Sequence, residues 1–349
     1  MTIAGVASAF PSYQYDQRVL LSALQRHWGP KLDNPVFVER LQARVGVDTR
    51  YLALPIEEYY GLKEWGRANN HFIDVAQEIG QKALCGALSR AGLATADLGA
   101  IFFVSVTGIA SPSIDARLVN RMNLPVNIKR VPIFGLGCVA GAAGVARAAD
   151  YVRAYPKQVA AVLAVELCSL TLQQDDLSVA NVISSGLFGD GAAAVLVAGA
   201  DRESKGPEIL GTRSVFYPNS EHVMGWDISE KGFRIVLSRE VPEVIEDHLA
   251  ADVDAFLEEH GLSRSDIGAW VLHTGGPRVL EATAAALELP EEALAVSWDC
   301  LRRMGNLSSA SVLVVLEEFV TKKQPPAGTY GLLAAMGPGF CSELVLLRW

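Results

Sequence analysis

The sequence is poor in cysteine and lacks any cysteine pattern typical of a metal site or a disulfide framework. Its 349 residues include five cysteines, and no CxxC motif or Cys/His pair has the spacing of metal ligands. The odd, widely spaced set favours free thiols in a reducing compartment. We therefore expect no disulfide scaffold and no metal centre.

Long apolar runs and a basic excess are also missing. No stretch approaches the roughly 18 apolar residues of a membrane-spanning helix, and the N-terminus lacks the pattern of a signal peptide. Acidic residues outnumber basic ones by 39 to 30, a net charge of -9, which argues against a nucleic-acid-binding protein. With 50% hydrophobic residues the chain can bury a large core. These features predict a cytoplasmic protein with no membrane span and no nucleic-acid partner.

The chain repeats itself once. Residues 88–100 (LSRAGLATADLGA) and 257–269 (LEEHGLSRSDIGA) share six identical positions. At about the same offset GCVAG (137–141) corresponds to GNLSS (305–309), and further on FGDGAAAVLV corresponds to MGPGFCSELVLL. Three matches in the same order predict two similar halves. We place their boundary in the polar stretch 200–208, which gives halves of residues 1–203 and 204–349.

Apolar strands and helical patterns alternate within this plan. Residues 159–167 and 191–199 are typical of buried strands, whereas 75–91 and 142–153 have the apolar spacing of helices. The alternation predicts an α/β protein with mixed sheets covered on both faces. The charged and aromatic segment 25–70 shows little strand pattern, and we expect it to form an insertion on the first half.

Cys138 is the candidate nucleophile because of its surroundings. It lies in FGLGCVAGAAG, where a glycine-flanked turn precedes a helix of small residues. At a helix N-terminus the backbone N–H groups favour a thiolate, so the sequence predicts a lowered pKa for this thiol. The alternative is a small buried cysteine without reactivity. A dinucleotide fingerprint is excluded, because the spacing is GxGxxxG and no acidic residue follows at the required distance.

His273 and Asn306 are the candidate partners of this thiol. His273 ends an apolar strand pattern and meets two glycines in VLHTGGP, a frequent catalytic placement in α/β folds. Asn306 occupies the place in the second half that Cys138 occupies in the first. Structural roles, a satisfied histidine and a helix cap, are the alternatives. A Cys-His-Asn set suits acyl transfer from a thioester followed by decarboxylation to an enolate.

With these motifs the chain resembles the thiolase superfamily, and within it the chalcone-synthase-like type III polyketide synthases. LGCVAG, LFGDGAAAV, GNLSSASVLVVLEE and the GPG at 337–339 carry the resemblance, which covers essentially the whole chain. It implies a five-layered αβαβα fold from two duplicated halves, and a homodimer. It also implies an acyl-CoA starter loaded on Cys138, extension with malonyl-CoA, cyclisation in one site and no tightly bound cofactor.

The resemblance also implies roles for further residues. Phe188 in LFGDG matches the phenylalanine that separates the coenzyme A tunnel from the cavity. The implied cavity-lining residues are Ser111, Cys168, Thr171, Trp226, Ile235 and Ser308. Arg40, Arg44 and Arg278 fall where basic residues would meet coenzyme A phosphates, although a solvated surface position is the alternative for each.

Departures from the plant pattern bear on the product. Ile235 stands where plant enzymes carry a second phenylalanine, and Ser111 where they carry methionine. Small residues at 110 and 111 favour a fatty-acyl starter and an alkylpyrone or alkylresorcinol product, whereas Trp226 would narrow the cavity. The alternatives are a small aromatic polyketide from malonyl-CoA and a single condensation like that of ketoacyl synthase III. A non-catalytic partner subunit is disfavoured, because Cys138, His273 and Asn306 are all present.

Overall fold

The computed structural model describes residues 1–31 and 36–349, and its centre is a large mixed sheet. Nine strands of the described residues follow the order β11-β12-β13-β8-β1-β7-β6-β4-β5, and the pairs β10-β9 and β2-β3 lie apart from them. The strands are β1 (Thr2–Ala9), β2 (Tyr13–Asp16), β3 (Thr49–Leu52), β4 (Leu98–Val104), β5 (Lys129–Ile133), β6 (Val159–Leu167), β7 (Asp190–Ala198), β8 (Glu208–Phe216), β9 (Met224–Ser229), β10 (Gly232–Leu237), β11 (Ile267–Leu272), β12 (Tyr330–Gly337) and β13 (Cys341–Arg348).

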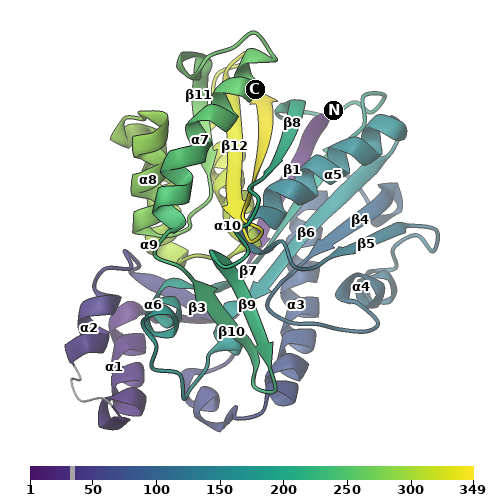
Figure 1. Ribbon diagram of the computed structural model, residues 1–349. Coiled ribbons are helices and arrows are strands. Elements are labelled where there is room, and N and C mark those ends of the chain that lie inside the picture. The colour runs from purple at the N-terminus through teal and green to yellow at the C-terminus, as the bar shows by residue number, and fades with distance from the viewer. Residues whose placement is uncertain (32–35) are drawn as a thin grey trace.

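Helices cover the strands on both faces and also lie between the two halves of the sheet (Figure 1). In chain order they are α1 (Gln17–Trp28), α2 (Val36–Gln42), α3 (Trp65–Ala91), α4 (Ile114–Met122), α5 (Ala140–Ala154), α6 (Val179–Leu187), α7 (Val241–Glu258), α8 (Pro277–Leu287), α9 (Ala295–Met304) and α10 (Ser309–Glu318). α3 packs on the first-half strands, α7 and α8 pack on the far side of the second half, and α5 and α10 touch strands of both. The expected αβαβα layering is confirmed.

The two halves of the sheet are joined at one narrow place. β1 and β8 pair only at Thr2 and Glu208, supported by backbone hydrogen bonds from Ile3 to Pro207 and from Ile209 to Met1. The segment 200–208 connects β7 to β8 beside this junction. Since so few backbone contacts link the sheets, the central helices must supply most of the apolar contact between the halves.

Both copies of the first sequence repeat form the same local structure. The turns that follow helices α3 and α7 contain Gly92 and Gly261, each with a positive φ that glycine adopts without strain. A short 3-10 turn follows, in which the Asp97 and Asp266 carboxylates accept backbone N–H groups three residues earlier. The chain then enters β4 or β11. The identical positions of the repeat therefore specify a helix end, a turn and a strand start.

Small residues allow α5 and α10 to cross at close range. A Cβ at Gly141 would overlap the carbonyl oxygen of Ser309 at the start of α10 and would lie 3.0 Å from a methyl of Val312 in the same helix. Ten of the fifteen residues of α5 and eight of the ten residues of α10 are buried. This crossing brings the beginnings of α5 and α10 together, and Cys138 and Asn306 lie in the segments that lead into them.

The early segment differs in part from the expectation. α1 and α2 pack on α6 outside the layers, as expected of an insertion. However, residues 49–52 form β3, which pairs antiparallel with β2. In this strand buried Arg50 and Leu52 alternate with half-buried neighbours. Four alternating residues within a charged segment are too few to predict a strand from the sequence.

Candidate active site

Cys138 lies in the 3-10 turn Gly137–Val139 that leads directly into α5, as the sequence predicts. Its side chain is buried, with 5% of its surface exposed. Gly137 has φ +53°, and a Cβ there would lie 2.8 Å from Pro338 of the GPG segment. The turn therefore needs glycine both for its backbone conformation and for close contact with the second half of the chain.

Asn306 follows α9 and is fixed through both its backbone and its side chain. Its backbone exchanges hydrogen bonds with Leu187 and Gly189, both at 2.9 Å. The side-chain oxygen accepts the N–H of Ser308 at 2.7 Å, and Nδ2 donates to the carbonyl of Gly275 at 3.3 Å. The second amide N–H of Asn306 faces the Cys138 sulfur, where it can also meet a ligand.

His273 follows β11, and its ring is the least satisfied polar group near this site. Its backbone N–H donates to the Ala334 carbonyl at 3.1 Å. The side chain is buried, and neither ring nitrogen has a hydrogen-bond partner within the described residues. Buried polar atoms are normally paired, so two unpaired ring nitrogens suggest that a ligand is meant to meet them.

An outer cavity of about 1430 Å³ brings these residues together. Cys138, His273, Asn306 and Phe188 all contribute to its wall. Cys138 Sγ also donates a weak hydrogen bond to Ser308 Oγ at 3.8 Å. Three side chains predicted from distant parts of the sequence thus line one space. Gly275, two residues after His273, accepts the hydrogen bond from Asn306.

The charge states differ from the prediction for Cys138. Burial raises the pKa of its thiol to about 12, which the nearby Glu166 reinforces, and the hydrogen bonds between this side chain and those of Ser308 and Asn306 offset the shift only partly. Burial also lowers the pKa of His273 to about 4. The predicted lowering of the thiol pKa is wrong for this arrangement, because lost hydration outweighs the helix terminus. At neutral pH the site holds a thiol and a neutral imidazole.

An inner cavity of about 100 Å³ lies on the other side of Phe188, which lines both spaces. Its wall includes the predicted residues Cys168, Thr171, Trp226 and Ile235. Trp226 and Ile235 are direct cross-strand partners on the β9-β10 hairpin. Phe188 thus lies between the two cavities, and the β9-β10 hairpin lines one side of the inner cavity.

Two predicted cavity residues lie elsewhere. Ser308 is buried beside Cys138 and lines neither cavity wall, and its φ of +50° places it at the sharp start of α10. Ser111 is exposed in the loop between β4 and α4 and also lines neither cavity in this chain. Sequence position alone could not reveal this, because the loop turns outward after the strand ends.

Arginines gather at the rim of the outer cavity. Arg44 and Arg278 line it as exposed side chains, as does Arg239, which the sequence analysis missed. Arg40 is exposed on α2 and is not among the lining residues. Arg239 lies two residues before the start of α7, and nothing in its local sequence pattern distinguishes it from other surface arginines.

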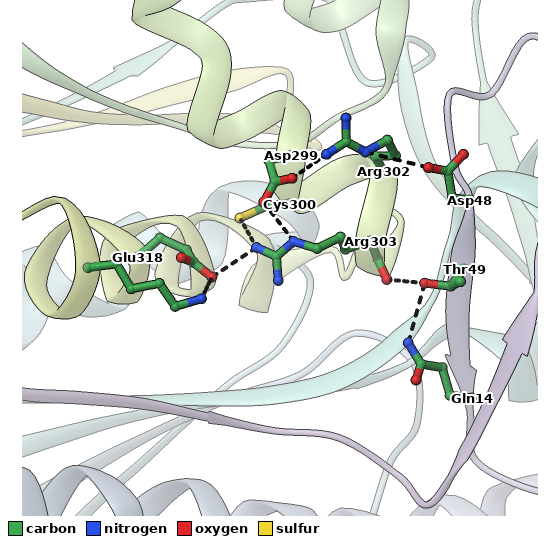
Figure 2. Close-up of polar contacts among 9 residues, drawn as sticks. Gln14, Asp48, Thr49, Asp299, Cys300, Arg302, Arg303 and Glu318 are labelled. Carbon is green, nitrogen blue, oxygen red and sulfur yellow. Dashed lines mark hydrogen bonds and ion pairs between the residues drawn. The ribbon is translucent and has the colours of Figure 1, made fainter.

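A polar cluster holds the chain just before Asn306 (Figure 2). Arg303 near the end of α9 pairs with Asp299 and with Glu318 of α10. Thr49 of β3 donates to the Arg303 carbonyl at 2.7 Å and accepts from Gln14 at 3.3 Å. The cluster joins α9, α10 and the β2-β3 pair, so it restrains the segment that carries Asn306.

Two further observations bear on the sequence expectations. Among the described residues no group of three His, Cys, Asp or Glu side chains could hold a metal ion. No helix in the described part of the chain is long and apolar enough to cross a membrane.

The arginine rim yields a test. We expect Arg44→Ala, Arg239→Ala and Arg278→Ala each to raise the KM for a coenzyme A thioester several-fold with little change in kcat. The reason is that exposed charges contribute to binding phosphates rather than to bond making. Arg40→Ala is the comparison variant, and steady-state kinetics at two salt concentrations is the measurement. An equal effect of Arg40→Ala would contradict the assignment of the rim.

Comparisons with known proteins agree with this geometry. The family model for the N-terminal domain of chalcone and stilbene synthases matches residues 47–202, and the model for their C-terminal domain matches residues 208–349. A 1,3,6,8-tetrahydroxynaphthalene synthase of Streptomyces peucetius subsp. caesius is 48% identical over 351 residues, covering 100% of this chain and 93% of that protein. A phloroglucinol synthase of Pseudomonas fluorescens is 31% identical, with 97% of each chain covered.

A solved structure shares the fold of the whole chain. The 1,3,6,8-tetrahydroxynaphthalene synthase of Streptomyces coelicolor A3(2), a bacterial type III polyketide synthase, superposes with a TM-score of 0.93 at 33% identity. The alignment covers 100% of this chain and 99% of that one. With both family models matched in order and the fold shared throughout, this chain belongs to the chalcone and stilbene synthase family and is a type III polyketide synthase, an acyltransferase that works by decarboxylative condensation.

Proposed function

We propose that this enzyme makes a small aromatic polyketide from malonyl-CoA, with Cys138, His273 and Asn306 as the catalytic residues. The size of the inner cavity carries the proposal. Its volume of about 100 Å³ holds roughly seven to ten water-sized groups, at the ~10–15 Å³ of open space that one water needs. A chain of a few acetate units fits this space. The names of the tetrahydroxynaphthalene and phloroglucinol synthases among its relatives support the same class of product.

Acyl loading begins with a proton transfer inside the buried site. Because the imidazole of His273 is neutral at pH 7, it can accept the proton of the Cys138 thiol. Each charge is costly alone, but the thiolate and the imidazolium stabilise each other when they form together. The thiolate attacks the starter thioester, the bond between the acyl carbon and the coenzyme A sulfur breaks, and coenzyme A leaves with the proton from His273.

Decarboxylation and condensation use the same residues in a second role. The thioester oxygen of malonyl-CoA would accept hydrogen bonds from the second amide N–H of Asn306, which faces the Cys138 sulfur, and from His273. As carbon dioxide leaves, negative charge develops on that oxygen, and these donors stabilise the enolate. The enolate carbon then attacks the acyl group on Cys138, a carbon–carbon bond forms, and Sγ leaves as the thiolate. The lengthened chain, now on coenzyme A, returns to Cys138 for the next cycle.

The alkylpyrone or alkylresorcinol product is the second candidate, and one observation favours it. A third cavity of about 800 Å³ shares wall residues with the inner cavity, among them Tyr59, Thr171 and Gln174. An alkyl chain longer than the inner cavity could extend into it. None of the relatives compared above has an alkylated product in its name. Three expectations stay predictions: that the protein is a homodimer, that it is cytoplasmic, and that it takes coenzyme A thioesters without a carrier protein.

Product analysis tests the proposal. With malonyl-CoA as the sole substrate we expect an aromatic product built from several acetate units, identified by mass spectrometry. We expect Cys138→Ala to abolish it. A strict need for a fatty-acyl starter would support the alkyl product instead. A single condensation that requires a carrier protein would support the ketoacyl synthase III alternative and reject our proposal.

The proton transfer predicts a pH dependence. A thiol with a pKa of about 12 that acted alone would be alkylated tenfold faster for each pH unit up to pH 12. Transfer to His273 should give a plateau at much lower pH, and His273→Gln should move the rise back to higher pH. Iodoacetamide labelling of Cys138, in a Cys85→Ser background that removes the exposed thiol, measures this. Identical pH profiles with and without His273 would exclude the ion pair.

A further inference from the structure

Arg50 is a buried cation in the wall of the inner cavity, and the mechanism above gives it no role. It lies on β3 with 3% of its surface exposed. We propose that Arg50 determines starter specificity by binding the carboxylate at the starter end of a malonyl-primed chain. This inference rests on the proposed function, because it concerns a chain that grows from Cys138 into the inner cavity.

The guanidinium of Arg50 has unused hydrogen-bond donors. Nε donates to Gln17 Oε1 at 3.0 Å, and one terminal nitrogen donates to the carbonyl of Phe188. A guanidinium has five N–H groups. The other three N–H groups make no hydrogen bond with the described residues, and because Arg50 lines the inner cavity they are available to a ligand there.

Arg50 also lacks a carboxylate in contact. Within the described chain no acidic group lies within ion-pair distance of it, although Asp190 attracts it from further away. The Asp190 carboxylate accepts hydrogen bonds from the backbone N–H groups of Ala53 at 2.6 Å and Ser169 at 2.8 Å. Asp190 is not one of the residues that line the inner cavity. Burial lowers the pKa of Arg50 only to about 10, so the side chain stays charged at pH 7. The cavity wall thus presents a positive charge without a direct counter-ion.

The position of Arg50 matches the end of a growing chain. Its bond to the Phe188 carbonyl places it on the inner-cavity side of Phe188, and the Phe188 backbone in turn pairs with Asn306. A chain attached to Cys138 that passes Phe188 brings its starter end into the inner cavity. A malonyl starter ends in a carboxylate, which the planar fork of an arginine can bind through two parallel hydrogen bonds. A neutral alkyl end would leave the donors unpaired and the charge buried.

The test is a competition between two starters of nearly equal size. Isovaleryl-CoA carries a branched alkyl end where malonyl-CoA carries its carboxylate. Each protein receives both thioesters at equal concentration, and mass spectrometry separates malonyl-only products from isovaleryl-primed ones. We expect Arg50→Met to lower the ratio of malonyl-only to isovaleryl-primed product by about tenfold or more, because a charge-assisted hydrogen bond is lost. Arg50→Lys, which keeps the charge but not the fork, should give an intermediate ratio.

The controls separate this role from a structural one. If Arg50 only supported the Phe188 carbonyl, Arg50→Met would reduce both products together and leave their ratio unchanged, which would overturn the inference. Arg202→Met removes a partly buried arginine outside both cavities and should leave the ratio at the wild-type value. If Arg50→Met does not fold, as judged by thermal unfolding, Arg50→Lys and Arg50→Gln decide. Wild-type protein that forms no malonyl-only product would overturn the proposed function, and with it this inference.

Discussion

The crossing of α5 and α10 is the contact on which the rest of the structure depends. At Gly141 the two helices approach so closely that no side chain fits against the Ser309 carbonyl. The Ser309 hydroxyl also donates a hydrogen bond to the carboxylate of Glu166 at the end of β6. This carboxylate accepts two further hydrogen bonds, from the Val106 backbone N–H and the Thr107 hydroxyl, and its burial raises its pKa. Since the sheets themselves meet at a single residue pair, this crossing aligns the halves and sets Cys138 against the segment of Asn306.

Charge is distributed around the site in a way that serves thioester chemistry. Arginines stand at the exposed rim, where phosphates of a coenzyme A ester can remain partly hydrated. Inside, burial favours a neutral thiol and a neutral imidazole, so the reactive ion pair forms only by transferring a proton within the site. Beyond Phe188 a positive charge returns at Arg50. In this arrangement the arginine rim would admit an anionic substrate, the uncharged site would surround the bond-making step, and Arg50 would bind the end of the growing polyketide.

Much of this organisation could be predicted from the sequence, because repeats and glycine-flanked turns are local signals. The Gly92 and Gly261 units, the turn at Cys138 and the strand end at His273 all follow from short segments. Arg239, Arg50 and Ser111 could not be placed, because their environment is made by segments distant in the sequence. The pKa shift predicted for Cys138 was wrong in direction for a related reason. The helix terminus can be recognised in the sequence, whereas the depth at which the thiol is buried cannot.

The most direct test of the central claim is the effect of Gly141→Ala on both stability and activity, with Gly66→Ala as the matched control. The added methyl at Gly141 must push α10 away, so we predict a loss of about 1–3 kcal/mol in unfolding free energy and slower malonyl-CoA decarboxylation. A Cβ at Gly66, also in a helix, meets nothing within 4 Å, and both properties should be kept. A Gly141→Ala enzyme as stable and as active as the wild type would contradict the account.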